Sequence, residues 1–407
     1  MVSGFTFAFG GDDLEDLDDV SDTDRQQGSI PAVQRQVDDE NQSGLIFQEA
    51  EKLDIDEMLA SLPSQMEFDT QLIHDPTGGG PFLIGRRQLI DIRLQLMAEQ
   101  DMLNEREDLL FGLQREDINP SIYEGGFKTW ECSMDLATHL AGKYNGGFIL
   151  PDGEEVINII EFGAGTGMPS LSLFYSFLAG QADPNAAKRR KVHFVLTDYN
   201  AAVLKLATLP NMLLTWYISR RNPREGNPME ADHNADHLME IDQALLEDFR
   251  RDISELGITL SFISGAWSPK FVDLCLQQQP NTGEGTAVED QSTTQERRTL
   301  ILASETIYSP TSLLPFTETL VSLLRRAVSN GGARYRENNP PIQALISAKK
   351  VYFGVGGGIS EFLATMGGVV RGKDEFKTRT LLEVFDAGVG RIILDIVPEK
   401  FTDRSPP

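Results

Sequence analysis

Cysteine is scarce in this chain of 407 residues, where Cys132 and Cys275 are the only two. Two cysteines can form neither a disulfide framework nor a cysteine-based zinc site, and so low a number fits a reducing intracellular compartment. No basic segment followed by an apolar run opens the chain, so the sequence predicts no signal peptide. The longest uncharged stretch, residues 162–182, has an apolar part of about a dozen residues, whereas a membrane-spanning helix needs roughly 20. We therefore expect no membrane segment.

Basic residues are also few, with 36 Lys and Arg against 62 Asp and Glu, which gives a formal net charge of −26. Residues 1–60 hold 16 acidic and 3 basic residues and so carry half of that excess. An acidic chain repels the phosphate backbone, which argues against direct binding to nucleic acid. Two interpretations stay open: the acidity serves solubility alone, or it attracts a basic protein partner.

Three regions follow from the composition and the apolar spacing. Residues 1–80 are predicted to be a disordered acidic N-terminal region, because they are polar and end in the breaker run Pro-Thr-Gly-Gly-Gly. Residues 81–119 are predicted to be a helical extension, because Leu89, Ile92 and Leu96 fall on one stripe. Residues 120–407 are predicted to form one α/β domain, interrupted by polar surface insertions at 220–242 and 277–298.

Strand patterns in the third region alternate with helical patterns. The predicted strands are 156–162, 192–198, 258–264, 299–304, 342–348, 379–385 and 389–396. Only three residues separate the last two, which is the spacing of a hairpin. This order predicts a mostly parallel sheet with helices on both faces and one antiparallel strand.

A glycine turn after the first of these strands is the strongest chemical signal. Glu161 closes the strand, and the turn that follows contains Gly163, Ala164, Gly165 and Gly167. A dinucleotide fingerprint needs G-x-G-x-x-G, but the spacing here is G-x-G-x-G with a carboxylate two residues ahead. That carboxylate disfavours a phosphate and suits a cationic group.

The second strand ends in Asp198, which is placed to accept the hydroxyls of a ribose. S-adenosylmethionine has a ribose and an ammonium group but no phosphate. The pattern therefore favours this cofactor over two alternatives, NAD and a turn with no ligand.

Two further strand ends carry candidate side chains. Trp267 follows the third strand, where it could stack on an adenine or serve as a core anchor. Ser304 and Glu305 end the fourth strand, at the position that would face the transferred methyl group. The alternative for Glu305 is a charge at a helix N-terminus.

Several motifs, taken together, resemble the eukaryotic protein-histidine N-methyltransferases of the methyltransferase-like family. They are Tyr-Glu-Gly-Gly at 123–126, Lys-Thr-Trp-Glu at 128–131, the turn 161–167, Asp-Tyr-Asn at 198–200, Leu-Pro-Asn at 209–211, Ser-Glu-Thr-Ile-Tyr at 304–308 and Tyr-Phe-Gly-Val-Gly-Gly-Gly at 352–358. The resemblance covers about residues 83–400.

The resemblance implies a class I seven-stranded, Rossmann-like S-adenosylmethionine-dependent methyltransferase fold. It implies methyl transfer to the tau nitrogen of a histidine in large-subunit ribosomal protein three, with a role in ribosome biogenesis and translation in the cytoplasm and nucleus. A monomer is the working expectation. The cofactor contacts that it implies are Trp130, residues 163–165, Asp198, Trp267 and Ser304.

The chemistry of such a reaction assigns roles to two residues. A neutral histidine is already nucleophilic at its unprotonated nitrogen, so the reaction needs the right tautomer more than a strong base. We expect Glu305 to accept a hydrogen bond from the imidazole nitrogen that carries the proton. We expect Tyr308 to pack beside the imidazole ring.

Other readings remain open. A lysine methyltransferase could use the same fold, because fold does not determine the acceptor. A non-enzymatic acidic chaperone of a ribosomal protein would not need the intact glycine turn. His233 and His237 have helical metal-ligand spacing but no further ligands, so no metal site is expected.

Overall fold

The computed structural model describes residues 48–98, 125–144, 155–179, 191–221, 237–277, 296–330, 340–370, 372, 375–385 and 388–399. The predicted disorder of residues 1–47 therefore lies outside the described residues.

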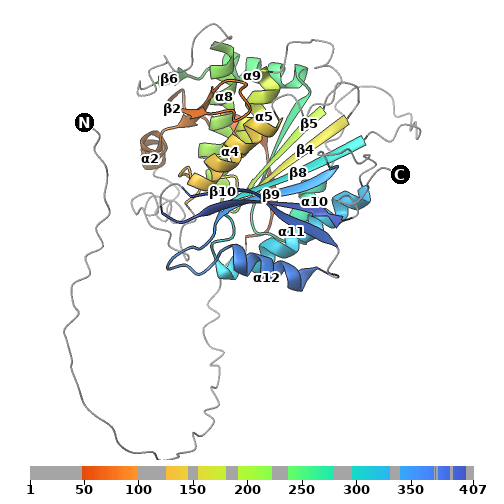
Figure 1. The fold of residues 1–407 in the computed structure, drawn as a ribbon. Helices are drawn as coiled ribbons and strands as arrows, with labels where there is room; N and C mark the ends of the chain where they lie inside the picture. Colours follow the sequence, from red (N-terminus) through yellow and green to blue (C-terminus); the bar gives the residue numbers. More distant parts are fainter. Residues whose placement is uncertain are drawn as a thin grey trace, which may run out of the picture. The chain divides into compact units, whose positions relative to one another are not determined.

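A central sheet of eight strands forms the described fold (Figure 1). Its order is β1 (Glu51–Leu53), β7 (Ile258–Ser264), β5 (Lys191–Asp198), β4 (Glu155–Phe162), β8 (Glu296–Ser304), β9 (Ile342–Lys349), β11 (Arg391–Pro398) and β10 (Phe376–Val384). The five strands from β7 to β9 are parallel, and β11 is inserted antiparallel between β9 and β10. All seven predicted strands are present, and this order confirms the class I methyltransferase fold.

Helices cover both faces of this sheet (Figure 1). One face packs against α4 (Glu131–Tyr144), α5 (Met168–Ala179), and the continuous run α7 (Ala201–Val203), η1 (Leu204–Thr208) and α8 (Leu209–Arg221). The other packs against α10 (Pro269–Leu276), α11 (Pro310–Asn330) and α12 (Ile359–Val369). Residues 201–220 are long and apolar enough to cross a membrane, but 72% of that window is buried, as in a core helix.

A second, antiparallel sheet corrects the predicted helical extension. It has the order β3 (Phe82–Arg87), β2 (Gln65–Ile73) and β6 (His237–Glu240). A helix is present only as α2 (Leu89–Ala98), where Ile92 and Leu96 are buried but Leu89, the third residue of the predicted stripe, is exposed. Residues 99–119 are outside the described part. The sheet packs on α8 so closely that a Cβ on Gly85 would lie 2.5 Å from the Leu214 Cβ, which explains a glycine inside β3.

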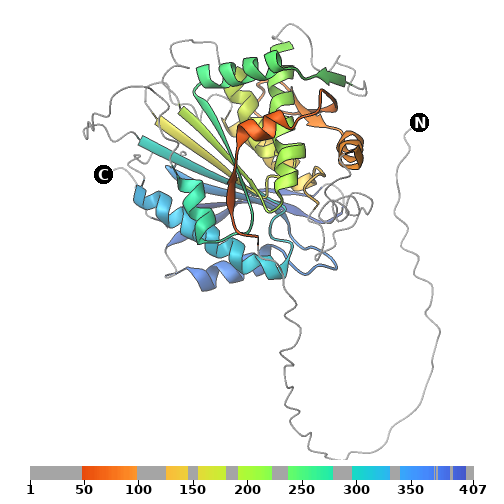
Figure 2. The ribbon, with the colours of Figure 1, turned by 180° about the vertical axis from the view of Figure 1, so that it is seen from behind.

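The predicted disorder of residues 1–80 is wrong from residue 48 onward. Strand β1 pairs with the edge strand β7, and α1 (Ile55–Ala60) and β2 follow it, as the back view shows (Figure 2). The acidic composition was misleading because the acids lie outside the core: Asp54 caps α1 by accepting the Asp56 and Glu57 N–H groups, while Met58 and Leu59 are buried.

The two predicted insertions also contain core structure at their ends. The first predicted insertion, 220–242, includes β6, where Met239 is buried, and the helical spacing inferred for His237 is wrong because it lies in that strand. The second, 277–298, ends inside β8, where Arg298 is buried. Residues 222–236 and 278–295 lie outside the described residues.

Candidate active site

The glycine turn lies where the strand order of the sheet reverses, between β5 and β8 on either side of β4. This is the edge at which doubly wound sheets bind their ligands. Gly163, Gly165 and Gly167 have φ angles of 59°, 53° and 77°, which side chains rarely adopt. The turn is fixed by hydrogen bonds from the Ala164 N–H to the Thr197 carbonyl at 2.7 Å and from the Gly167 N–H to the Ala164 carbonyl at 2.7 Å.

Asp198, at the end of β5, lies against this turn. One carboxylate oxygen accepts the Gly165 N–H at 3.1 Å and the other accepts the Asn200 N–H at 3.1 Å. The structure thus brings together the acid and the glycines that the sequence separates by more than 30 residues. A carboxylate at this strand end, beside the turn, is the type of group that accepts the hydroxyls of a ribose.

Glu161 is fully buried beneath the turn. Its Oε2 accepts the Ser170 N–H at 3.0 Å, while its Oε1 has no hydrogen-bond partner among the described residues. Burial raises the pKa of this carboxyl to about 8, opposed by the hydrogen bonds from Ser170 and reinforced by the charge of Asp198. A buried acceptor without a partner fits the ammonium group of S-adenosylmethionine, reached directly or through a water.

This carboxyl should make cofactor affinity depend on pH. At pH 7 a group with a pKa of about 8 is mostly protonated, whereas a bound ammonium favours the carboxylate, so binding releases a proton. Affinity for S-adenosylmethionine should therefore rise with pH, by up to about tenfold per unit, and level off above pH 8. Calorimetry in buffers of different ionisation enthalpy measures both the affinity and the released proton.

Glu161→Gln should remove this pH dependence, and Glu247→Gln on the exposed face of α9 (Gln243–Glu255) is the matched control. Equal slopes in the wild type and Glu161→Gln would contradict the assignment.

Trp130, just ahead of α4, lies in a segment packed against the glycine turn. Its Nε1 donates to the Gly125 carbonyl at 3.1 Å, and the Lys128 and Lys349 Nζ atoms lie 5.2 and 5.6 Å from the centroid of its ring. A Cβ on Gly165 would approach the neighbouring Gly126 carbonyl to 3.1 Å. The segment that carries Trp130 thus packs against the turn, and the contact of Trp130 with a cofactor stays a prediction.

Trp267 follows β7 and is partly buried, with its ring edge-on to Phe316 at a centroid distance of 5.1 Å. The same loop is braced by a segment that the sequence reading missed. The Ala266 N–H donates to the Gln48 carbonyl at 2.9 Å, and Gly265 (φ 110°) has no room for a Cβ, which would lie 2.6 Å from the Glu49 carbonyl. The chain ahead of β1 therefore supports the wall on which an adenine would stack.

Ser304 and Glu305 end β8 beside the turn, where a Cβ on Gly163 would lie 2.9 Å from the next side chain, Thr306. Ser304 is buried, and Glu305 is partly buried. Glu305 is the only non-glycine residue with a positive φ, 55°, in the described part of the chain. A carboxylate residue held in this conformation at a strand end is typical of functional sites, where surrounding contacts maintain the strain.

The Glu305 carboxylate lies against the Tyr352 hydroxyl and the Cys132 thiol. Its Oε2 accepts the Tyr352 hydroxyl at 2.5 Å, and that hydroxyl in turn accepts the Lys349 N–H at 3.2 Å. Its Oε1 is buried and has no hydrogen-bond partner among the described residues. Tyr352 therefore fixes one oxygen, while the other is a buried acceptor that receives no hydrogen bond of good geometry from the described residues.

Burial and the neighbouring Glu305 carboxylate determine the protonation of two further groups. They raise the pKa of the Tyr352 phenol well above its ordinary value and also raise that of the Cys132 thiol. Both groups stay protonated at neutral pH, which excludes Cys132 as a thiolate nucleophile.

Tyr308 is partly buried beside this cluster, with its ring centroid 6.2 Å from that of Tyr352. Its backbone carbonyl faces Gly357 so closely that a Cβ there would lie 2.3 Å away. Sequence reasoning did not select Tyr352 as a site residue, although it begins the glycine-rich motif 352–358. Tyr352 and Glu305 are 47 positions apart, so only the fold shows that they touch.

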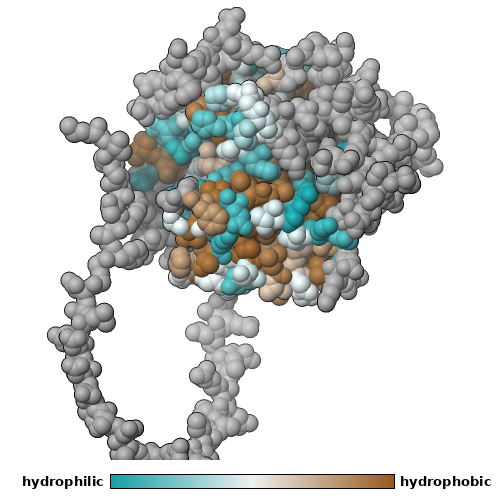
Figure 3. All heavy atoms as spheres, in the orientation of Figure 1, coloured by the Kyte–Doolittle hydropathy of each residue, from teal (hydrophilic) through white to brown (hydrophobic). Residues whose placement is uncertain are grey.

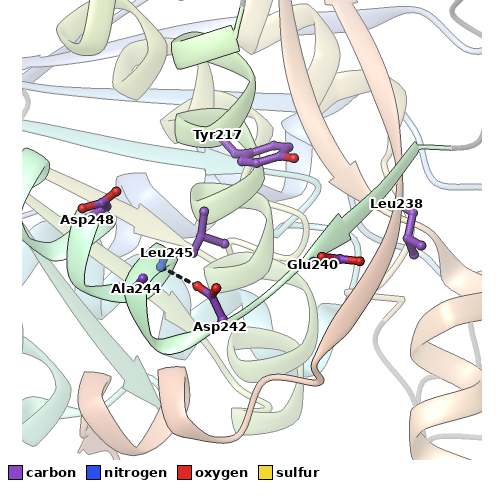
Figure 4. A pocket seen from close by; sticks show the side chains of 7 residues that line it. All are labelled: Tyr217, Leu238, Glu240, Asp242, Ala244, Leu245 and Asp248. Carbon is purple, nitrogen blue, oxygen red and sulfur yellow. Dashed lines mark hydrogen bonds between the residues drawn. The ribbon is translucent and has the colours of Figure 1, made fainter.

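The described residues contain no candidate metal site, and a large hollow among them lies away from the glycine turn. No group of three or more His, Cys, Asp or Glu side chains there could hold a metal ion. An open hollow of about 440 Å³ lies away from the glycine turn (Figure 4) and is lined by Tyr217, Leu238, Glu240, Asp242, Ala244, Leu245 and Asp248. Asp242 there accepts the Leu245 N–H at 2.8 Å and so caps α9, which gives this acid a structural role.

Known proteins resemble the chain along most of its length. No family model matches it. It is 29% identical over 378 residues to histidine protein methyltransferase 1 of Saccharomyces cerevisiae, covering 88% of this chain and 89% of the yeast protein. A homologue in Rattus norvegicus is 29% identical over 280 residues, covering 69% of this chain and 58% of the rat protein.

One solved structure, assigned as a class I S-adenosylmethionine-dependent methyltransferase from Listeria monocytogenes, aligns with a TM-score of 0.33 and 12% identity, covering 78% of this chain and 70% of that one. Histidine protein methyltransferase 1 of Schizosaccharomyces pombe is 30% identical over 310 residues, covering 76% of this chain and 75% of that protein. With the turn, the acids and the strand order in place, the chain belongs to the histidine protein methyltransferase 1 family.

Proposed function

We propose that this chain methylates the tau nitrogen of a histidine in large-subunit ribosomal protein three and thereby acts in ribosome biogenesis and translation. Family membership and fold make the chain an S-adenosylmethionine-dependent protein-histidine methyltransferase. The observation that carries the proposal is the Glu305 carboxylate, which presents a buried, unpartnered oxygen beside the glycine turn.

The cofactor, when bound, supplies a methyl group made electrophilic by the sulfonium. The protein must hold the imidazole in line with it and in the right tautomer. We assign Oε1 of Glu305 to accept the N–H of the proximal nitrogen, which leaves the lone pair of the distal nitrogen for attack. The same carboxylate then stabilises the imidazolium that forms. Tyr308 would pack beside the imidazole ring.

For cofactor binding we assign the turn residues Gly163, Ala164, Gly165 and Gly167 together with Trp130, Glu161, Asp198, Trp267 and Ser304. The geometry supports this set because β4, β5, β7 and β8 all end at one edge of the sheet, and the segment before α4 folds over it. We place the reaction in the cytoplasm and nucleus, where ribosomal proteins are made and assembled.

Incubation with labelled S-adenosylmethionine and ribosomal protein three, followed by mass spectrometry, tests the proposal. We expect label on the tau nitrogen of one histidine. Label on lysine would favour the lysine methyltransferase reading, and no label on the protein would refute the proposed substrate.

The net charge of −26 predicts a salt effect on this reaction. A basic protein substrate is attracted over a distance of about a Debye length, which shortens as salt is added. Raising the ionic strength from about 0.05 to 0.3 M should lower kcat/KM for ribosomal protein three by about tenfold. A short, uncharged histidine peptide is the control. If kcat/KM for the full-length substrate does not change with ionic strength, the acidic charge serves solubility alone.

A further inference from the structure

Two phenylalanines are the most exposed large hydrophobic side chains among the described residues. Phe353 is 79% exposed and Phe385 is 72% exposed, and Val351 nearby is 48% exposed. Figure 3 shows apolar surface between hydrophilic residues on the side where Figure 1 places β9, β10 and α12. Exposed aromatic side chains that gather in one place mark interaction surfaces more often than chance exposure does.

Contacts through Lys350 join the two chain segments that carry these three side chains, which we call the rim patch. The Lys350 Nζ lies 4.6 Å from the centroid of the Phe385 ring and 2.6 Å from Glu383 Oε2, so it joins the loop after β9 to the end of β10. The Lys350 N–H also donates to the Gly390 carbonyl at 2.8 Å. Val351 and Phe385 therefore flank Lys350, and Phe353 follows two residues later.

The loop that carries Phe353 is fixed by its own backbone. Val351 and Gly358 form a bridge across its base, and the Tyr352 carbonyl accepts the Val355 and Gly356 N–H groups. Gly357 packs on the Tyr308 carbonyl with no room for a Cβ. Phe353 is therefore presented by an ordered loop, which lowers the entropic cost of binding a partner.

This loop is continuous with the active site. Tyr352 is 7% exposed and donates to Glu305 at 2.5 Å, while its two neighbours in the chain, Val351 and Phe353, are exposed. The rim patch thus begins one residue from Tyr352, the side chain that holds Glu305 in place. A polypeptide whose histidine reaches Glu305 would therefore lie close to this loop.

The two lysines beside the patch present no unpaired positive charge to a basic segment. Lys350 is paired with Glu383, and Lys349 is paired with Glu131 at 3.2 Å, so both cations beside the loop are neutralised. The whole chain is strongly acidic. An anionic lipid surface would be repelled, whereas a cationic protein with apolar side chains near its histidine fits.

We propose that Val351, Phe353 and Phe385 form the docking surface for the segment of the basic protein substrate that flanks the methylated histidine, with apolar side chains of that segment packed on the two phenyl rings. This inference rests on the proposed function, because it takes the acceptor to be a histidine brought to Glu305. It predicts that the patch sets the affinity for the protein substrate and leaves cofactor binding unchanged.

The experiment compares the full-length wild type with the double variant Phe353→Ser/Phe385→Ser. Leu94→Ser/Leu238→Ser is the matched control, because these leucines are 57% and 52% exposed on α2 and β6. With ribosomal protein three as substrate, we expect the rim variant to raise KM at least about tenfold while kcat changes less than about twofold. The control should match the wild type, and calorimetry should give all three proteins the same Kd for S-adenosylmethionine.

A second measurement does not depend on turnover. Fluorescence anisotropy of labelled ribosomal protein three, with S-adenosylhomocysteine present, should give a Kd that is at least about tenfold weaker for the rim variant. Equal KM and Kd in wild type and rim variant would overturn the docking surface while leaving histidine methylation intact. Label on lysine in the wild type would refute the proposed function, and the Kd comparison would still decide the docking surface. A wild-type dimer that the rim variant converts to monomer would identify a self-interface and overturn the inference.

Discussion

Replacing Glu305 with glutamine is expected to lower kcat by about 100-fold, with KM for both substrates changed less than about threefold. Glutamine keeps the size of the side chain and can accept a hydrogen bond, but it carries no charge to stabilise the imidazolium that forms during transfer. Loss of one preorganised electrostatic contact of this kind costs about 10²–10³ in turnover. Steady-state kinetics on the histidine substrate provides the measurement, and Glu318→Gln on the exposed part of α11 is the control.

Tyr352→Phe separates the charge of Glu305 from its orientation. The phenylalanine removes the hydroxyl that donates to Oε2 at 2.5 Å and leaves the carboxylate in place. We expect a smaller loss of kcat, about tenfold, because the carboxylate keeps its charge and loses the hydroxyl that orients it. If Glu305→Gln keeps the wild-type kcat, Glu305 has no part in the mechanism, whatever the effect of Tyr352→Phe.

Replacing Gly165 with valine is expected to weaken S-adenosylmethionine binding more than about 100-fold. Gly165 has a φ of 53°, which is especially unfavourable for a β-branched residue, and its N–H donates to Asp198. A Cβ there would also meet the Gly126 carbonyl at 3.1 Å, so the turn and the segment leading to Trp130 cannot both keep their positions.

Calorimetry measures the affinity, and thermal unfolding reports whether the fold survives. Gly367→Val in α12 is the matched control, because a Cβ at that position meets nothing within 4 Å. Cofactor affinity within tenfold of the wild type in Gly165→Val would show that the glycine turn does not contact the ligand.

The strands of the central sheet and the acids at their ends could be predicted because each depends on neighbouring residues. Buried parallel strands are continuous apolar runs, as in β4 and β5, and the turn after β4 needs glycine wherever φ is positive. The alternation of these strands with helices then places Glu161, Asp198 and Glu305 at one edge of the sheet.

The region before the domain could not be predicted in the same way. Strand β1 has three residues and contributes no apolar pattern of its own; it is a strand because β7 offers it a free edge. Strand β2 contains Glu67 and Asp69 and is held by β3, β6 and the face of α8. The acidic, polar composition predicted disorder there because composition carries no information on strand pairing between segments about 200 residues apart.

The sequence by itself determined the strands of the central sheet, the glycine turn and the acids at the strand ends, because each depends on a local pattern of residues. Only the tertiary structure decided which side chains support them. It placed the Tyr352 hydroxyl on Glu305, the backbone of residues 48–49 against the Trp267 loop, and Phe353 and Phe385 on the rim. These contacts join distant parts of the chain, and no local propensity encodes them, since their free energy exists only once the sheet has brought the loops together.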